Sequence, residues 1–249
     1  MSVGLSTLLK STAFALKVFR LYWSFLVVVF LFPITYAVVV VAMMQGSPEA
    51  LKVALTGYVV IAGFSVLFSM PATLVTEMFE EQVLETLALL PVPFWEIMVS
   101  QLLALALVGT ASLSVGLVGL WYVSGGADLA LLIVGFALVF SLYIPLAVLV
   151  GITVKSRVKL QSLLSILSFL IVIVTPAFYR LAYIGEPYRT LLLVNPLAHV
   201  TAVLRAAVGI PEGVSETLSI AYATLTSLAL SVIIWYKLRR GVFTVVERR

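Results

Sequence analysis

The sequence predicts an all-α integral membrane protein, a single transmembrane domain over residues 1–249 with six transmembrane helices. Hydrophobic residues make up 63% of the chain and charged residues 10%, whereas soluble proteins contain roughly 45–50% and about 25%. A water-soluble fold of this length could not bury so much apolar surface, so lipid must serve as solvent. A helix that crosses a hydrocarbon core of about 30 Å needs about 20 mainly apolar residues, and six stretches satisfy this condition.

The six predicted spans are joined by connections of unequal length. The spans cover residues 23–44, 55–75, 97–123, 129–154, 163–178 and 218–236. A short basic loop at 155–159 joins the fourth and fifth spans, while the connections 76–96 and 179–217 are longer. The two long connections are therefore the places to look for structure outside the spans.

Residues 1–22 are expected to form a helix that lies in the membrane interface. Its apolar and small residues fall on one helical face, with Lys10 and Lys17 elsewhere: Leu5, Leu8, Leu9, Thr12, Ala13 and Leu16. A simple extension of the first span is the alternative interpretation.

The distribution of Lys and Arg predicts the orientation of the chain in the membrane, because cytoplasmic loops carry an excess of both. With the N-terminus inside, 11 of the 15 Lys and Arg residues lie on the inner side and 4 on the outer side. Both termini are therefore expected to be cytoplasmic. The basic residues form juxtamembrane clusters with no basic and aromatic stripe, so nucleic-acid binding is not expected.

The sequence contains no motif for chemistry of its own, so no catalytic, cofactor-binding or metal-binding residues are predicted. It has no phosphate-binding GxxxxGK[ST] loop, no HExxH and no GxSxG. There is no cysteine, and the single histidine, His199, has no second ligand or carboxylate near it in sequence. The predicted span interiors also lack the charged residues that ion-coupled transporters use. Energy for any uphill transport must then come from a partner.

The connection 76–96 contains a segment with helical periodicity. Glu77, Glu81 and Glu85 recur every four residues, which predicts an acidic stripe on a helix over 77–90 that ends before Pro91. Such a helix could rest on lipid headgroups or dock on a protein. Docking on a basic partner is favoured, because anionic inner-leaflet lipids attract Lys and Arg and would repel this helix.

Two motifs resemble the signature of the ABC-2 type transport permease family. The first is an acidic run followed by a proline break and Trp-Glu-Ile, and its matching residues are Leu84, Glu85, Leu87, Pro91, Val92, Trp95, Glu96 and Ile97. The second is Asn195-Pro196-Leu197 with Arg205 downstream, before the last span. This sequence departs from the family pattern at Gln82-Val83, where Gly-Thr is usual, and it lacks basic residues in the acidic run.

The resemblance implies partners and a role for each long connection. Two permease chains, identical or different, would pair, and each would contact a separate ATP-binding subunit that holds ATP and Mg. Residues 77–90 would be the coupling helix in a groove of that ATPase, with contacts from Glu77, Glu80, Glu81, Val83, Leu84, Glu85 and Leu87. Residues 179–217 would form re-entrant helices in the outer leaflet, including Asn195, Pro196, Leu197 and Arg205.

The sequence itself supports an unusual structure for 179–217, which is too apolar for a solvated loop and is broken by Pro187, Pro196 and Pro211. The resulting prediction is the membrane subunit of an ABC exporter in the plasma membrane of a prokaryote, surrounded by membrane lipids. Its substrate would be amphipathic or lipid-like, because the spans lack formal charges. A haem-exporter-like component and an intramembrane lipid-modifying enzyme are the alternatives.

Overall fold

A computed structural model describes residues 5–21, 31, 35, 38, 42, 47–89, 92–154 and 156–241. Over this part of the chain the protein is helical and contains no strand. Its helices are α1 (Leu5–Leu21), α3 (Pro48–Gly63), η1 (Phe64–Ser69), α4 (Met70–Met78), α5 (Glu81–Ala88), α6 (Phe94–Ser124), α7 (Leu129–Val154), α8 (Arg157–Val174), η2 (Leu181–Tyr183), α9 (Tyr188–Leu192), α10 (Pro196–Ala207) and α11 (Glu216–Gly241). Here η1 is a π-helical segment and η2 a single 3₁₀ turn.

Five helices of the described chain are long and apolar enough to cross a membrane. They cover Pro48–Met78, Phe94–Ser124, Leu129–Val154, Arg157–Val174 and Glu216–Leu238, and they correspond to the second to sixth predicted spans. The first predicted span, 23–44, lies outside the described residues except for isolated positions. The count of six spans therefore stays a prediction.

Several boundaries differ from the expectation: the second span begins at Pro48, seven residues before the predicted start, and α8 ends at Val174, four residues before the predicted end. α8 begins at Arg157, inside the predicted basic loop 155–159. Arg and Lys are good helix formers, and their long side chains can extend from a helix end toward the polar surface. The basic residues therefore belong to the first turn of the helix, and the predicted loop is correspondingly shorter.

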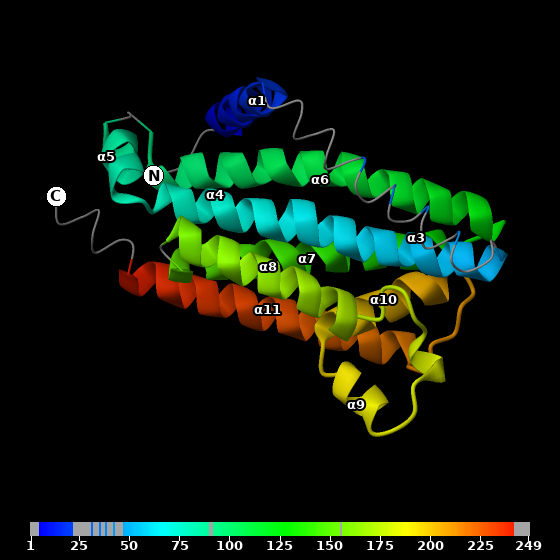
Figure 1. Ribbon diagram of the computed structural model, residues 1–249. Helices are drawn as coiled ribbons and strands as arrows, with labels where there is room; N and C mark the ends of the chain where they lie inside the picture. The colour runs from blue at the N-terminus through cyan, green and yellow to red at the C-terminus, as the bar shows by residue number, and fades with distance from the viewer. Residues whose placement is uncertain are drawn as a thin grey trace.

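The long helices lie side by side along a common direction (Figure 1). α3, η1 and α4 form one continuous rod of 31 residues, and 78% of the residues in its most apolar stretch are buried inside the protein. α3 packs against α6, α4 packs against α7, and α10 packs against both α7 and α11, which also contact each other. α5 lies at one end of the molecule, whereas α9, α10 and the beginning of α3 lie at the other (Figure 1).

Small residues allow the rod to pack closely on its neighbours, as is common between helices in membranes. A Cβ atom at Gly116 of α6 would lie only 2.5 Å from the ring of Tyr58 in α3. The Tyr58 hydroxyl donates a hydrogen bond to the carbonyl of Ser112, at 3.0 Å. α6 is thus held directly against α3, the N-terminal half of the rod.

α1 is a separate helix that packs against α6 (Figure 1). Thr12 and Ala15 are buried, whereas Leu9 and Phe14 are 61% and 69% exposed. The packed side of α1 therefore differs in part from the apolar face that the sequence predicts, since Ala13 is exposed. The position of α1 in a membrane interface stays a prediction.

Candidate functional site

The predicted coupling helix over 77–90 is not one continuous helix. α4 ends at Met78, Glu80 is extended with φ −67° and ψ 137°, and a new helix, α5, begins at Glu81. The Phe79 ring packs edge-on against Phe94 at the beginning of α6, with 5.4 Å between ring centroids. This contact holds the turn that separates α4 from α5. The prediction of a single helix over 77–90 was wrong, because the periodicity of a local sequence contains no information about such a tertiary contact.

The break gives the predicted contact residues different surroundings. Glu77 belongs to the end of α4, where its Oε1 lies 3.2 Å from Nη2 of Arg157 at the beginning of α8. Both side chains are partly exposed, at 37% and 63%, so the ion pair contributes at most about 1 kcal/mol to stability. Glu77 therefore joins two long helices and is not part of α5.

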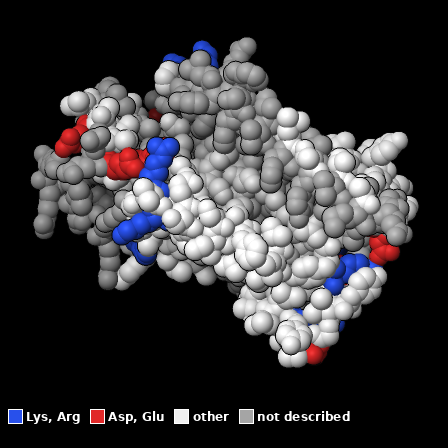
Figure 2. Space-filling view, in the orientation of Figure 1, with Lys and Arg blue, Asp and Glu red and all other residues white. Residues whose placement is uncertain are grey.

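α5 itself carries most of the remaining predicted contact residues. Glu85 is exposed, whereas Val83, Leu84 and Leu87 are half-buried. Glu80 is half-buried at the N-cap position of α5. The side chain of Glu81 lies outside the part of the chain that the structure describes. Just beyond α5, Leu89 is 85% exposed. Charged side chains gather at the α5 end and at the opposite end of the described surface, and further basic side chains lie along the upper edge, over α1 (Figure 2).

At the opposite end, the motif Asn195-Pro196-Leu197 begins α10. The Asn195 Oδ1 accepts a hydrogen bond from the Leu197 amide at 3.0 Å, and Pro196 occupies the first turn, a combination typical of helix N-termini. The Asn195 Nδ2 also donates to Thr175 Oγ1 at 2.9 Å. The motif therefore starts α10 and ties it to the segment that follows α8.

The last residue of the second motif, Arg205, is fully buried with 0% exposure. Its Nη1 lies 2.8 Å from Glu212 Oε1, and the Glu212 side chain is 1% exposed. A buried charge is tolerated only when it is paired and hydrogen-bonded, and this pair meets both conditions. Burial lowers the pKa of Arg205, whereas the neighbouring Glu212 carboxylate opposes that shift.

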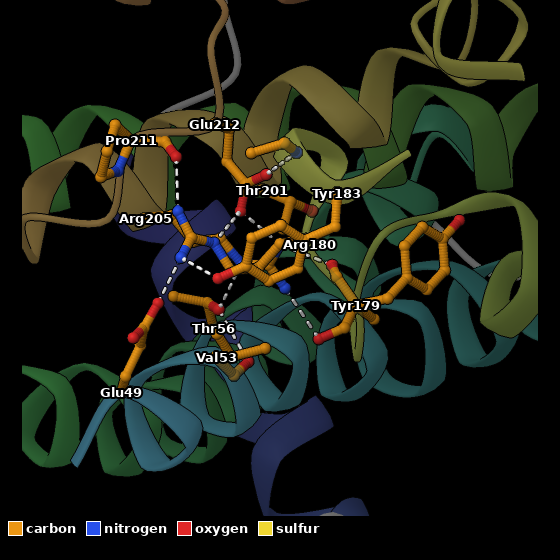
Figure 3. A network of polar contacts seen from close by, with 12 residues as sticks. Glu49, Val53, Thr56, Tyr179, Arg180, Tyr183, Thr201, Arg205, Pro211 and Glu212 are labelled. Carbon is orange, nitrogen blue, oxygen red and sulfur yellow. Dashed lines mark hydrogen bonds and ion pairs between the residues drawn. The ribbon is translucent and has the colours of Figure 1, made fainter. Parts of the chain in front are cut away.

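Arg205 joins four segments through its remaining donors (Figure 3). Nε donates to Thr56 Oγ1 of α3 at 3.2 Å. Nη1 also donates to the Tyr179 carbonyl at 2.8 Å, and Nη2 donates to the Ala177 carbonyl at 3.1 Å. Glu212 lies in the loop after α10. The side chain of Arg205, itself in α10, therefore connects α10 to α3, to the segment after α8 and to that loop. We call Thr56, Ala177, Tyr179, Arg180, Arg205 and Glu212 the arginine cluster.

Arg180 is the second cation of the cluster. It pairs with Glu49 in the first turn of α3, and its Nε lies 3.8 Å from Glu212 Oε1. Nη2 donates to the Pro211 carbonyl at 2.8 Å. Glu212 thus lies between two guanidinium groups, and α3 contacts both arginines (Figure 3).

His199 has a packing role in α10. Its Nε2 lies 2.9 Å from the Leu193 carbonyl and its Nδ1 3.1 Å from Ser219 Oγ. Burial lowers the pKa of its imidazole. Among the described residues, no group of three or more His, Asp or Glu side chains is placed to hold a metal ion.

Sequence reasoning identified Arg205 but missed its partners. Thr56 is 149 positions away in the chain, so no local pattern could have joined the two. Glu212 carried a weak signal, because it is the first acidic residue after Arg205 in an apolar segment.

A comparison with protein families matches residues 47–238 to the family described as ABC-2 family transporter protein. The match extends from the residue before α3 into α11 and includes both motifs. A search of curated proteins finds no sequence that matches the chain. The family match confirms the resemblance of the two motifs: the chain belongs to the ABC-2 transporter family and is a membrane subunit of a transporter.

Proposed function

We propose that the chain is the permease of an ABC exporter, which moves an amphipathic or lipid-like substrate outward with ATP hydrolysed by a separate subunit. The observation that carries this proposal is α5, a short helix beyond the ends of the long helices. It is joined to the buried rod by only Phe79 and Glu80. A partner bound to α5 could therefore move α4 directly, and this is what energy coupling requires.

The surface of α5 suits a protein contact. Glu85 is exposed and Leu89 is 85% exposed, so the patch combines an acidic group with an uncovered apolar one. Protein interfaces commonly have an apolar centre and a polar rim. A basic groove with an apolar floor on an ATP-binding subunit would complement the patch.

The remaining parts of the proposal follow from this placement. The α5 end would be cytoplasmic, with both termini, and the arginine cluster would lie on the outer side of a prokaryotic plasma membrane. The apolar faces of α6, α8 and α11 would meet lipid or a second permease chain, in a homodimer or a heterodimer. The predicted spans contain no Asp, Glu, Lys or Arg, which favours an amphipathic or lipid-like substrate.

The two alternatives receive less support. A haem-exporter-like role would need axial ligands, but both nitrogens of His199 have partners within the fold. A lipid-modifying enzyme would need polar groups free to react. In the arginine cluster, the Arg205 guanidinium and the Glu212 carboxylate bind each other and nearby protein groups.

Co-purification tests the docking role of α5. The tagged permease is isolated in mild detergent together with the ATP-binding subunit, and Glu85→Lys and Leu89→Ser are compared with the parent chain. Both variants should lose most of the ATPase, because each changes the exposed patch. The matched control is Glu216→Lys, an exposed charge reversal at the other end of the molecule. Retention of the ATPase by both α5 variants would refute the proposed docking.

A further inference from the structure

The cations at the two ends of the molecule have different surroundings. At the end that holds the arginine cluster, Arg180 and Arg205 share the carboxylate of Glu212. In the same region, the Lys52 Nζ donates to the Val208 carbonyl at 3.0 Å. The protein itself therefore supplies acceptors for these positive charges.

At the α5 end, two lysines lack an acidic partner. Lys159 in the first turn of α8 and Lys237 near the end of α11 are both exposed. In the part of the chain that the structure describes, neither forms an ion pair. The Lys237 Nζ donates only to the neutral Thr153 Oγ1, at 3.0 Å. These charges are therefore available to an anion from outside the chain.

The lysines and Arg157 lie at one corner of the molecule. Thr153 belongs to the last turn of α7, and α8 begins at Arg157 after residues 155 and 156, so the hydrogen bond from Lys237 brings α11 to the beginning of α8. Basic side chains gather over this end of the surface, beside the acidic ones (Figure 2). The segments 155–160 and 235–241 contain no Asp or Glu. We call Arg157, Lys159 and Lys237 the basic corner.

The lengths of the two helices place the basic corner at the level of lipid headgroups. α8 has 18 residues, about 27 Å at 1.5 Å per residue, which is close to the hydrocarbon thickness of about 30 Å. Its first turn therefore lies at one boundary of the hydrocarbon. Lys237 is the last residue but one of the apolar span in α11. Trp235 and Tyr236, 55% and 49% exposed, precede it, as is typical of a membrane interface.

The corner continues into apolar surface along both helices. Only 11% of the residues in the most apolar stretch of α8 are buried inside the protein, and 17% of those in α11. Phe169 of α8 is 67% exposed and Val232 of α11 is 64% exposed. An occupant that matches both features has a negative group and long hydrocarbon chains. A soluble acidic protein would match the charge alone, and a second copy of this chain in a symmetric contact would add like charges.

We propose that the basic corner binds an anionic phospholipid of the bilayer, with its headgroup at Arg157, Lys159 and Lys237 and its acyl chains along α8 and α11. Charge complementarity favours this occupant, because anionic lipids attract Lys and Arg at a membrane surface. The proposal goes beyond the export function. It concerns binding to this chain alone, so it can fail while the ATPase docking holds, and the reverse.

Photolabelling of the purified chain in nanodiscs tests the proposal. The bilayer is phosphatidylcholine with a trace of either phosphatidylglycerol or phosphatidylcholine that carries a diazirine in its acyl chain. Both leaflets have the same composition, so the result does not depend on orientation. After illumination, mass spectrometry gives the ratio of phosphatidylglycerol label to phosphatidylcholine label on residues 157–174 and 216–238. At low salt this ratio should be severalfold above one and above the ratio on α6, and it should fall as salt screens the charges.

Neutralisation of the lysines provides the decisive comparison. A Lys near an anionic surface contributes about fivefold in affinity. Lys159→Gln alone should therefore lower the label ratio by about fivefold, and Lys159→Gln with Lys237→Gln should lower it further, toward one. Lys159→Arg with Lys237→Arg keeps both charges and should retain the preference for phosphatidylglycerol.

The matched control is Lys10→Gln with Lys17→Gln, which removes the same charge from two exposed lysines of α1 and should leave the ratio on α8 and α11 unchanged. Thermal unfolding verifies that each variant is folded. A ratio of one in the parent chain would overturn the proposal, as would a ratio that the Lys159 and Lys237 variants do not lower. An equal fall in the α1 control would show a general charge effect and would also overturn it.

Discussion

The arginine cluster gives the sharpest stability prediction, through Arg205→Met. Methionine keeps an unbranched apolar side chain but removes the cation from a site with 0% exposure. Glu212 would lose its cationic partner at 2.8 Å and keep the more distant Arg180, at 3.8 Å, and the Ala182 amide, which donates to its Oε2 at 3.1 Å. Removal of one member of a buried ion pair costs about 3–5 kcal/mol. The carbonyls of Ala177 and Tyr179 would lose donors as well.

Thermal unfolding in detergent measures this effect. Each kcal/mol corresponds to about 2–4 °C for a soluble domain of comparable length, so the midpoint should fall by about 6–20 °C. Arg189→Met is the matched control. Its Nη2 bonds only the carbonyls of Glu212 and Gly213 at a partly exposed site, so its cost should be about 1 kcal/mol or less.

A double variant separates the ion pair from general packing. Arg205→Met with Glu212→Gln removes both charges together, so no buried carboxylate is left without its partner. Its destabilisation should be clearly smaller than the sum of the two single effects. If Arg205→Met behaves like Arg189→Met, or if the single effects add, the cluster does not hold this end of the fold together and our reasoning is wrong.

Two further predictions concern orientation and pH. The chain contains no cysteine, so Leu89→Cys and Tyr183→Cys each introduce a unique thiol. In intact cells, a membrane-impermeant maleimide should label Tyr183→Cys but not Leu89→Cys. The reverse pattern would show that the proposed orientation is inverted. Burial lowers the pKa of His199 from 6.5, so the unfolded chain takes up a proton at a higher pH than the folded one. As pH falls below about 6.5, stability should therefore decrease, by at most about 1.4 kcal/mol per pH unit. His199→Gln should lose this component of the unfolding profile, and an unchanged slope would contradict the assignment.

Hydropathy predicted the long helices well because length and apolar content alone determine whether a segment can span a bilayer. The predicted span 129–154 coincides with α7, and 97–123 lies within α6. Asn195 and Pro196 likewise carry local capping signals that mark the beginning of α10. These features need no knowledge of the tertiary structure.

The parts that sequence reasoning missed all depend on contacts between distant segments. The break after α4 depends on Phe79 packing against Phe94, and the arginine cluster brings Thr56 to Arg205. The π-helical segment η1 has no signature in apolar content, because a change in hydrogen-bond register leaves the residues equally apolar. Only the folded chain shows where a uniform hydrophobic run changes its geometry.

The position of η1 links the two ends of the proposed permease. One buried rod carries Thr56 at the arginine cluster and ends at the turn that leads into α5. Midway along it, η1 packs Phe64 and Phe68 beside Tyr143 of α7. π-helical segments in helices frequently lie at functional sites, and Pro71 is the second residue of α4, which follows η1. A displacement of α5 would therefore reach the arginine cluster through a rod whose middle is π-helical, and we expect that any bend during transport is centred there.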